Sequence, residues 1–306
     1  MSKHPILILI VLFCTRPILA QDWRVSVLLA EDGLPADEVR SVMVDSHGAV
    51  WAGTREGVGR LVHDEWEAFT AEDGMLSNGA TDIIEDAAGR IWVSGPAGVS
   101  IYASEAWATI TDLDWLQPRI IFDLAAKTDS TVWFGANGGG GYYDHDEWTV
   151  YSQANGLSHQ VVHSAWEDRS GVKWFACRRG LVKMKEDSVE VLFPDVNFGS
   201  ILEAANGQIW FGSRTRGAAA MRGATFEWHS VAEDLRPVAE DAEGKIWAVS
   251  EEDSGEGSVW FFGDGRWSRL NADGVFDERT VFDIAIGRDG SVWVGTSRGL
   301  IHLKPH

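Results

Sequence analysis

Cysteine is nearly missing from this chain, and so are long apolar segments. Of the 306 residues only 2 are cysteine, Cys14 and Cys177, and Cys14 lies within a predicted leader. The mature chain would keep one thiol, which excludes an internal disulfide. Beyond residue 20 no apolar run approaches the ~18 residues that a membrane helix requires. We therefore predict a mature domain that is stabilised by its core alone and contains no membrane span.

The start of the chain has the pattern of a secretory signal peptide. Lys3 gives a basic start, residues 6–14 form a short apolar run, and Ala20 supplies a small residue for cleavage. This pattern predicts that residues 1–20 are removed after Ala20. Residues 21–306 would then form one domain in the periplasm or outside the cell. The alternative interpretation of the first segment is a buried N-terminal strand.

Positive charge is also scarce. The chain has 26 Lys and Arg residues against 46 Asp and Glu, a net charge of −20, and loss of the leader removes two more positive charges. Such a chain repels the phosphates of nucleic acids and the headgroups of anionic membranes. Both are therefore excluded as main partners, and the excess of acid also favours solubility.

The familiar catalytic and cofactor motifs are absent from the sequence. It contains no P-loop, no G-x-S-x-G, no H-E-x-x-H and no C-x-x-C. No calcium-binding loop is complete, because none has acids at alternate positions followed by a distal glutamate. We therefore predict no cofactor and expect a protein that is not an enzyme.

Tryptophan, by contrast, is abundant, and part of it recurs at one position of a repeat. The chain has 16 tryptophans. The segments DSHGAVWAGTREGV (45–58), DAAGRIWVSGPAGV (86–99) and DRSGVKWFACRRGL (168–181) show the shared pattern. The repeated markers, 36 to 46 residues apart, are Trp51, Trp92, Trp133, Trp174, Trp210, Trp247 and Trp293. Seven units of about forty residues fill the mature chain.

Each unit is predicted to form four short antiparallel strands. An alternating strand precedes a D-x-x-G turn, the tryptophan strand follows it, and a loop ending in glycine leads to the third strand. This pattern predicts an all-β, seven-bladed β-propeller with four-stranded blades. The last unit is short of a fourth strand, and the sequence after Trp23 repeats the sequence after Trp66. Residues 22–29 are therefore predicted to complete the last blade and close the ring.

The repeat resembles that of a known family. The order G-L-P/S, D-x-x-G-x-x-W-x-G-T and x-x-G-L resembles the two-component regulator propeller repeat. The best matches are residues 33–61, 74–101, 156–183 and 287–303. The resemblance implies a periplasmic sensor propeller, of the kind found in hybrid histidine kinases and as free-standing exported proteins, with a carbohydrate as ligand. The Trp-Phe pairs are also similar to those of streptogramin lyases, which implies a histidine and a magnesium ion at the channel mouth.

Two repeated side chains are interpreted as structural. An aspartate that begins a D-x-x-G turn accepts a hydrogen bond from the backbone two residues on. The marker tryptophans are expected to bury their rings between neighbouring blades, because seven equivalent indoles do not form one binding site. The aspartates assigned to the turns are Asp45, Asp86, Asp168, Asp241 and Asp289.

The candidate ligand-binding residues lie at the channel mouth. In a propeller the start of the innermost strand and the loop between the second and third strands open on the same face. The first position carries Arg40, His163 and Arg236, and in the other units Thr81, Phe122, Gly199 and Phe282. The second-to-third loops carry Arg55, Arg178, Arg179, Arg214, Arg216 and Arg298. Arginine suits bidentate contact with carboxylates, so these arginines and His163 predict a site for an anion or a sugar. Alternatively, the arginines form exposed ion pairs of little energetic weight.

The next residue of each innermost strand is small or polar. These residues are Ser41, Asp82, Asp123, Ser164, Ser200, Pro237 and Asp283. They are expected to line the channel and to form hydrogen bonds between blades. Asp82, Asp123 and Asp283 are also weak candidates for holding a metal ion. His163 is a weak candidate for acid–base catalysis, because the sequence shows no partner for it. Trp115 and Trp166, near the start of inner strands, are assigned to core packing or to stacking on a sugar.

Together these features predict an exported propeller that senses or binds a small molecule or a carbohydrate at its mouth, with an anionic ligand favoured by the arginines. Two other functions remain open. One is a scaffold for a periplasmic or surface protein assembly. The other is a lyase that uses His163 and a divalent metal.

Overall fold

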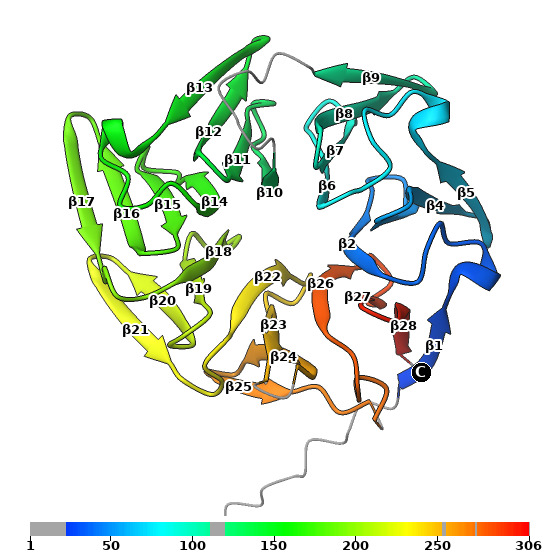
Figure 1. The fold of residues 1–306 in the computed structure, drawn as a ribbon. Helices are drawn as coiled ribbons and strands as arrows, with labels where there is room; N and C mark the ends of the chain where they lie inside the picture. The colour runs from blue at the N-terminus through cyan, green and yellow to red at the C-terminus, as the bar shows by residue number, and fades with distance from the viewer. Residues whose placement is uncertain (1–22, 111–119, 253–254, 273, 306) are drawn as a thin grey trace, which may run out of the picture.

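The chain forms a ring of seven four-stranded antiparallel sheets (Figure 1). The computed structural model describes residues 23–110, 120–252, 255–272 and 274–305. The seven-bladed propeller predicted from the repeat is confirmed. The innermost strands surround the ring axis, and successive blades follow one another around it (Figure 1). The predicted leader (1–20) and Trp115 lie outside the described residues.

Each of the first four blades consists of four strands that are consecutive in the chain. Their strands are β2–β5 (Val39–Val44, Val50–Thr54, Val58–Val62, Glu65–Phe69), β6–β9 (Asp82–Glu85, Ile91–Gly95, Gly98–Ala103, Ala106–Ile110), β10–β13 (Ile121–Ala126, Val132–Ala136, Gly139–Asp144, Glu147–Tyr151) and β14–β17 (Val162–Glu167, Lys173–Cys177, Gly180–Lys185, Ser188–Leu192).

The last three blades and three short 3-10 helices complete the described elements. The strands are β18–β21 (Phe198–Glu203, Ile209–Ser213, Ala218–Arg222, Thr225–His229), β22–β25 (Arg236–Glu240, Ile246–Glu251, Gly257–Gly263, Arg266–Arg269), and β26–β28 with β1 (Val281–Ile286, Val292–Thr296, Gly299–Pro305, Trp23–Leu28). The helices are η1–η3 (Ala30–Asp32, Ala71–Asp73, Gln153–Asn155). In the described part of the chain no helix has the length and apolar character needed to cross a membrane.

The first and last described strands of the chain meet in blade 7. Strand β1 is the outer strand of that blade and pairs antiparallel with β28, from Trp23 opposite Pro305 to Leu28 opposite Leu300. The pairing confirms the predicted closure. Because β1 covers the edge of β28, the first and last segments of the chain hold one sheet together.

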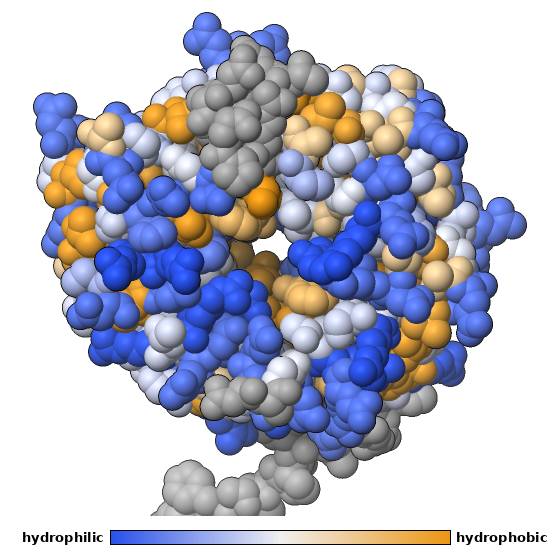
Figure 2. Space-filling view, viewed as in Figure 1, coloured by the Kyte–Doolittle hydropathy of each residue, from blue (hydrophilic) through white to orange (hydrophobic). Residues whose placement is uncertain are grey.

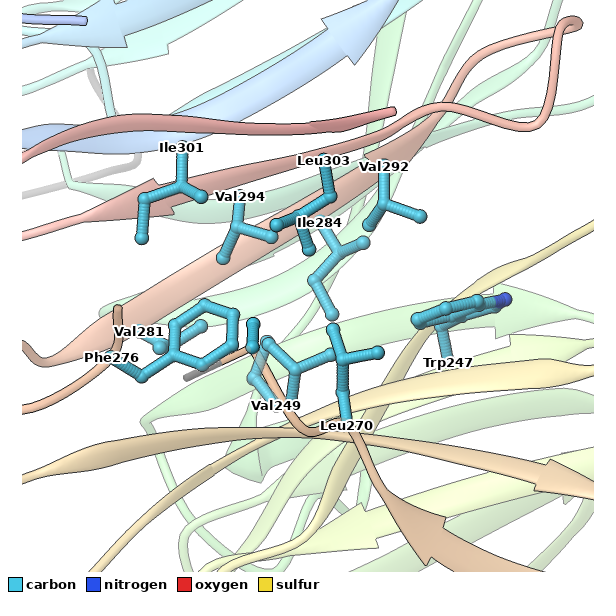
Figure 3. Close-up of a cluster of buried hydrophobic side chains, with 12 residues drawn as sticks. Trp247, Val249, Leu270, Phe276, Val281, Ile284, Val292, Val294, Ile301 and Leu303 are labelled. Atoms are coloured by element: carbon cyan, nitrogen blue, oxygen red, sulfur yellow. The ribbon is translucent and has the colours of Figure 1, made fainter. Parts of the chain in front are cut away.

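The core lies between the blades. Trp51 of blade 1 is 1% exposed, and its ring centroid lies 5.5 Å from that of Tyr102 in blade 2. Figure 3 shows the same arrangement between blades 6 and 7, where Trp247 and Leu270 face Ile284 and Val292. The marker tryptophans therefore join neighbouring sheets, as predicted. Cys177 is also buried, as a free thiol.

The turn aspartates do more than fold their own turns. Asp45 Oδ1 accepts from the backbone N–H groups of His47 and Ala49, as predicted, and Asp45 Oδ2 accepts from the indole of Trp51. The same indole bond recurs in blades 2, 4 and 6. The assignment of Asp289 to this set is wrong. Gly287 precedes Trp293 by the six residues that separate Asp45 from Trp51, whereas Asp289 is the third residue of this turn. Asp289 still forms the predicted bond, because it accepts from the N–H of Ser291 two residues on.

A second set of links joins neighbouring blades on the face that carries the turns. Glu85 of blade 2 accepts from the backbone N–H and the hydroxyl of Ser46 in blade 1, both at 2.6 Å. Glu203 of blade 5 accepts from the indole of Trp166 in blade 4 at 2.8 Å. Trp166 therefore lies at the turn end of its inner strand, and the predicted position near the channel mouth is wrong.

Candidate functional site

A backbone irregularity at the start of the inner strands shapes the channel mouth. In blades 1, 3, 4, 5 and 7 the register with the second strand shifts across one residue, which leaves that residue without a Cα partner. Such a bulge places two residues opposite one, so consecutive side chains share a face that a regular strand would divide. The bulged residues are Arg40, Phe122, His163, Gly199 and Phe282. Each therefore faces the channel together with the polar residue that follows it.

Two connected cavities occupy the channel. The outer chamber, about 240 Å³, is lined by all seven residues of the predicted mouth position, with Arg214 from the loop between β19 and β20. The wall of the inner chamber, about 470 Å³, includes apolar residues such as Met43, Ile84 and Ile201. Asp82, Asp123, Ser200 and Asp283 line both chambers. Figure 2 shows an opening at the ring centre with strongly hydrophilic residues beside it.

The side-chain stems of Arg214 and Arg236 come together in the outer chamber. A Cβ atom added at Gly199 would lie 2.9 Å from Cδ of Arg236 and 3.6 Å from Cγ of Arg214, so the glycine leaves room for both stems. Arg236 forms an ion pair with Asp234 at 2.9 Å, and its side chain is only 13% exposed. Among the described residues no carboxylate forms an ion pair with Arg214. Desolvation and the positive charge of Arg236 lower the pKa of Arg214. This side of the chamber therefore carries positive charge that is not fully neutralised.

His163 lies beside this pair as a neutral ring. Burial, followed by the charges of Arg214 and Arg236, lowers its pKa to about 4. Its Nε2 atom is buried, and within the described part of the chain it has no hydrogen-bond partner. The ring of Phe122 lies 5.5 Å away, centroid to centroid. His163 is therefore an uncharged residue of the chamber wall at neutral pH.

Arg40 and Phe282 form a separate part of the wall. The Arg40 guanidinium lies over the ring of Phe282, 5.7 Å from its centroid, and is paired with Glu38 at 2.7 Å. Because Glu38 neutralises it, Arg40 contributes less net charge to the chamber than Arg214 does. The two phenyl rings, Phe122 and Phe282, give the chamber an apolar surface next to its charged groups.

The floor of the outer chamber consists of three carboxyl groups, Asp82, Asp123 and Asp283, here called the carboxyl floor. Asp82 Oδ2 accepts from the N–H of Leu124 in blade 3 at 2.6 Å, and Asp283 Oδ2 accepts from the N–H of Val42 in blade 1 at 2.9 Å. These bonds confirm the predicted links between blades. Burial and the neighbouring Asp283 charge raise the pKa of Asp82 to about 7. Burial also raises the pKa values of Asp123 and Asp283.

The remaining predicted arginines lie outside the lining of the outer chamber. Arg55 pairs with Glu38 at 3.1 Å and Arg298 with Glu278 at 2.9 Å. Arg216 lies over the ring of Trp228, 4.1 Å from its centroid. Arg178 and Arg179 are exposed on the loop between β15 and β16. Of the nine predicted ligand-binding residues, the structure gathers Arg40, His163, Arg214 and Arg236 around one cavity.

The predicted metal site has no preformed geometry. Within the described residues no group of three or more His, Cys, Asp or Glu side chains is arranged to hold a metal ion. Asp82, Asp123 and Asp283 share the channel, and Asp82 and Asp283 accept from backbone N–H groups of neighbouring blades. Their geometry thus fits hydrogen bonding between blades.

Comparison with known proteins finds similar folds among solved structures. No protein-family profile matches the chain, and no curated protein matches its sequence. Among solved structures, the extracellular domain of BT3049 from B. thetaiotaomicron, described as a hybrid two-component system, is similar with a TM-score of 0.79 and 18% identity. The extracellular domain of BT4673 from the same organism is similar with a TM-score of 0.72 and 14% identity. The alignments cover 92% and 93% of this chain but only 42% of either neighbour, so the chain spans less than half of their length.

A streptogramin B lyase has a similar fold as well. The TM-score is 0.71 at 13% identity, and the alignment covers 93% of this chain and 98% of the lyase. Both propellers named by the sequence resemblance are thus structural neighbours of this chain. At these identities the likeness establishes the propeller fold, which carries many unrelated functions.

Proposed function

We propose that this chain is an exported sensor propeller that binds a small anionic molecule in the outer chamber. The observation that carries the proposal is the approach of Arg214 and Arg236 over Gly199, beside neutral His163. The positive charge of Arg236 lowers the pKa of Arg214, and an anion bound beside the two residues would reduce this repulsion. Arginine is also the side chain best suited to bidentate contact with a carboxylate or a phosphate.

The size of the chamber sets the size of the ligand. A volume of about 240 Å³ equals that of roughly eight water molecules at ~30 Å³ each. The chamber therefore suits one sugar unit or a molecule of similar size, and a longer oligosaccharide would have to extend beyond it. The apolar faces of Phe122 and Phe282 suit the body of such a ligand, and the arginines suit its charge.

The sensing role is supported by the structural neighbours. BT3049 carries a similar propeller in the extracellular domain of a protein described as a hybrid two-component system. BT4673 does so in a protein described both as a one-component and as a hybrid two-component system. Export of this chain is supported by the signal-peptide pattern of its first twenty residues. In this proposal the propeller receives the ligand outside the cytoplasm and passes the signal to another protein.

Calorimetry with a sugar acid and its neutral analogue tests the proposal. We expect glucuronate to bind more tightly than glucose, and Arg214→Gln to weaken glucuronate binding by roughly tenfold or more, the effect of one lost charge-assisted contact. Arg298→Gln is the matched control, because Arg298 is paired with Glu278 outside the chamber lining. Equal binding of the two sugars, or an equal effect of the two substitutions, would overturn an anion site at Arg214.

A lyase reaction is the second candidate function, because His163 lies in the chamber wall of a fold similar to a streptogramin lyase. Ring opening of a lactone substrate, followed by chromatography, tests it. Turnover that disappears in His163→Ala and persists in His159→Ala would support the reaction. Absence of product from the wild-type protein would remove it.

A further inference from the structure

The hydroxyl of Ser41 bridges two carboxyl groups of the carboxyl floor. Its Oγ lies 3.0 Å from Oδ1 of Asp82 and 3.1 Å from Oδ2 of Asp283. The same oxygen accepts from the backbone N–H of Ile83 at 3.1 Å. A serine hydroxyl has one hydrogen and can donate to only one carboxylate at a time.

One more hydrogen satisfies every contact of this group. If Ser41 donates to one carboxylate, the other carboxyl must be protonated and donate to Ser41. The Ser41 oxygen then donates once and accepts twice, which uses its full hydrogen-bonding capacity. Without that hydrogen, one of the two contacts would bring two electron-rich oxygens together inside the channel, at an energetic cost.

The backbone keeps the two carboxyl groups in this arrangement. Asp82 accepts from the N–H groups of Leu124 and Ile83, and Asp283 accepts from those of Val42 and Ile284. Four backbone donors, one from each of four blades, therefore limit rotation of the carboxyl groups away from Ser41. The hydrophobic cores between the blades fix the positions of these strands. The contacts of the two carboxyl groups with Ser41 are therefore fixed by the fold.

The electrostatic surroundings favour the proton as well. Burial and the Asp283 charge raise the pKa of Asp82 to about 7, and Asp123 adds a third carboxyl group nearby. The charged and titratable groups that face the floor from above are Arg40, His163, Arg214 and Arg236, and Glu85 lies in the inner chamber below. His163 has a pKa of about 4 and stays neutral above pH 5.5. The floor is therefore the group in the outer chamber that changes charge near neutral pH.

We propose that Asp82, Ser41 and Asp283 hold one shared proton, and that loss of this proton weakens binding of the anion in the outer chamber. The inference rests on the proposed function and adds its regulation. The ligand would lie directly above the floor, where a charged carboxylate repels it. Coupling between two sites is reciprocal, so binding of the anion also increases the affinity of the floor for its proton.

Calorimetry across pH tests the coupling. Glucuronate serves as the probe because its carboxylate stays ionised from pH 5.5 to 8.5. We expect its Kd to rise by about fivefold or more between pH 6 and pH 8.5, the low end of typical coupling between sites. Buffers with different ionisation enthalpies should also reveal the uptake of a fraction of one proton on binding near pH 7.5.

The Asp82→Asn variant distinguishes the effect of the carboxyl floor on binding from the effect of the other charged groups at the mouth. The amide can donate to Ser41 as a protonated carboxyl group does, so the variant should bind glucuronate with little dependence on pH. Glu278→Gln is the matched control, because it removes a carboxylate that pairs with Arg298 outside the chamber lining. This control should keep the pH dependence of the wild-type protein. The same pH dependence in Asp82→Asn and wild type would overturn the coupling.

The ligand-free protein gives an independent test of the proton. Infrared spectroscopy detects the carbonyl stretch of a protonated carboxyl group. We expect this band at pH 6 in the wild-type protein, its loss as pH rises through neutral, and its absence from Asp82→Asn. Lack of the band at pH 6 would overturn the shared proton even if glucuronate binds.

The outcomes distinguish this inference from the proposed function. Binding that depends on Arg214 but neither varies with pH nor takes up a proton would overturn the coupling and leave the proposed function standing. No binding of glucuronate at any pH would overturn both the anion site and its coupling, while the infrared band would still decide the shared proton.

Discussion

Trp51 and Asp45 are joined by a hydrogen bond of 2.9 Å between the indole Nε1 and Oδ2 of the carboxylate. The bond ties the start of a turn to the strand that leaves it and orients a ring buried between two blades. Equivalent bonds occur at Trp92, Trp174 and Trp247. In blades 3 and 5 the aspartate is replaced by Lys127 and Ala204, and Nε1 of Trp133 and of Trp210 has no partner among the described residues.

Because some marker tryptophans form this hydrogen bond and others do not, matched variants can test it. Trp51→Phe removes the indole donor, whereas Trp133→Phe removes a similar volume at a site without the bond. We expect Trp51→Phe to reduce the free energy of unfolding by about 1–3 kcal/mol more than Trp133→Phe, measured by urea denaturation. Trp51→Ala should cost about 3–5 kcal/mol, as for other buried aromatic residues. Equal losses in the two phenylalanine variants would show that the hydrogen bond adds no stability.

The repeat explains why much of the channel could be predicted. Because each unit adds one inner strand in the same register, one position of the sequence repeat becomes one ring of the structure. Arg40, His163 and Arg236 were assigned to a common ring on that ground, and the structure places all three in the chamber wall. The bulges that turn Arg40 and His163 toward the axis have no signature in the sequence, since bulged residues range from glycine to arginine.

The repeat did not predict which of the loop arginines line the outer chamber. Arg214 and Arg216 lie two residues apart on one loop, yet Arg214 lines the outer chamber and Arg216 lies over Trp228. A repeat fixes the strands but leaves loop conformation to local contacts. The approach of Arg214 to Arg236 likewise depends on Gly199, a residue whose importance lies in the side chain it lacks. Asp289 was misassigned because it is the third residue of its turn, and Gly287 takes the place of the first.

Stability should fall in acid because of the turn aspartates. Burial alone would raise the pKa of Asp168, but hydrogen bonds from Trp174, Ser170 and Val172 outweigh burial and lower it. A carboxyl group whose folded pKa lies below its unfolded value of ~3.9 adds stability above that value and loses it as the pH falls through the folded pKa. The stability difference between wild type and Asp168→Asn, measured by urea denaturation, should therefore shrink below about pH 4. An unchanged difference between pH 7 and pH 3 would contradict this account, and Asp187→Asn on the surface serves as control.

The carboxyl floor should have the opposite effect on the pH dependence of stability. The pKa of Asp82 is raised from an ordinary 3.8 to about 7. Between these values the unfolded chain loses its proton while the folded chain keeps it, so the stability contributed by this group falls as pH rises from about 4 to about 7. Asp82→Asn should lose less stability than the wild-type protein between pH 5 and pH 8 in urea denaturation. Parallel stability curves for the two proteins would show that Asp82 ionises normally.

Closure of the ring predicts a strong effect of shortening the chain. A chain that starts at residue 23 keeps β1, whereas one that starts at residue 30 exposes the edge of β28 and loses Val27, which packs against the blade 7 core. We expect the shorter chain to unfold at a lower temperature and to aggregate, because an unpaired strand edge binds other edges. Light scattering during thermal unfolding measures both effects. Equal melting temperatures for the two chains would contradict a stabilising role for β1.

Gly199→Ala tests whether the arginine pair needs the space above the glycine. The new Cβ atom would lie 2.9 Å from Cδ of Arg236, so the flexible stem of Arg236 must move and carry its guanidinium away from Arg214. We expect glucuronate binding to weaken by roughly tenfold, the cost of one displaced charged contact, with little change in melting temperature. Gly263→Ala is the matched control, because its nearest neighbour is also a flexible stem, Lys245 at 3.3 Å, and it lies outside the chamber lining. If both alanine variants bind glucuronate as tightly as the wild-type protein, the position of Arg236 over Gly199 has no part in recognition of the anion.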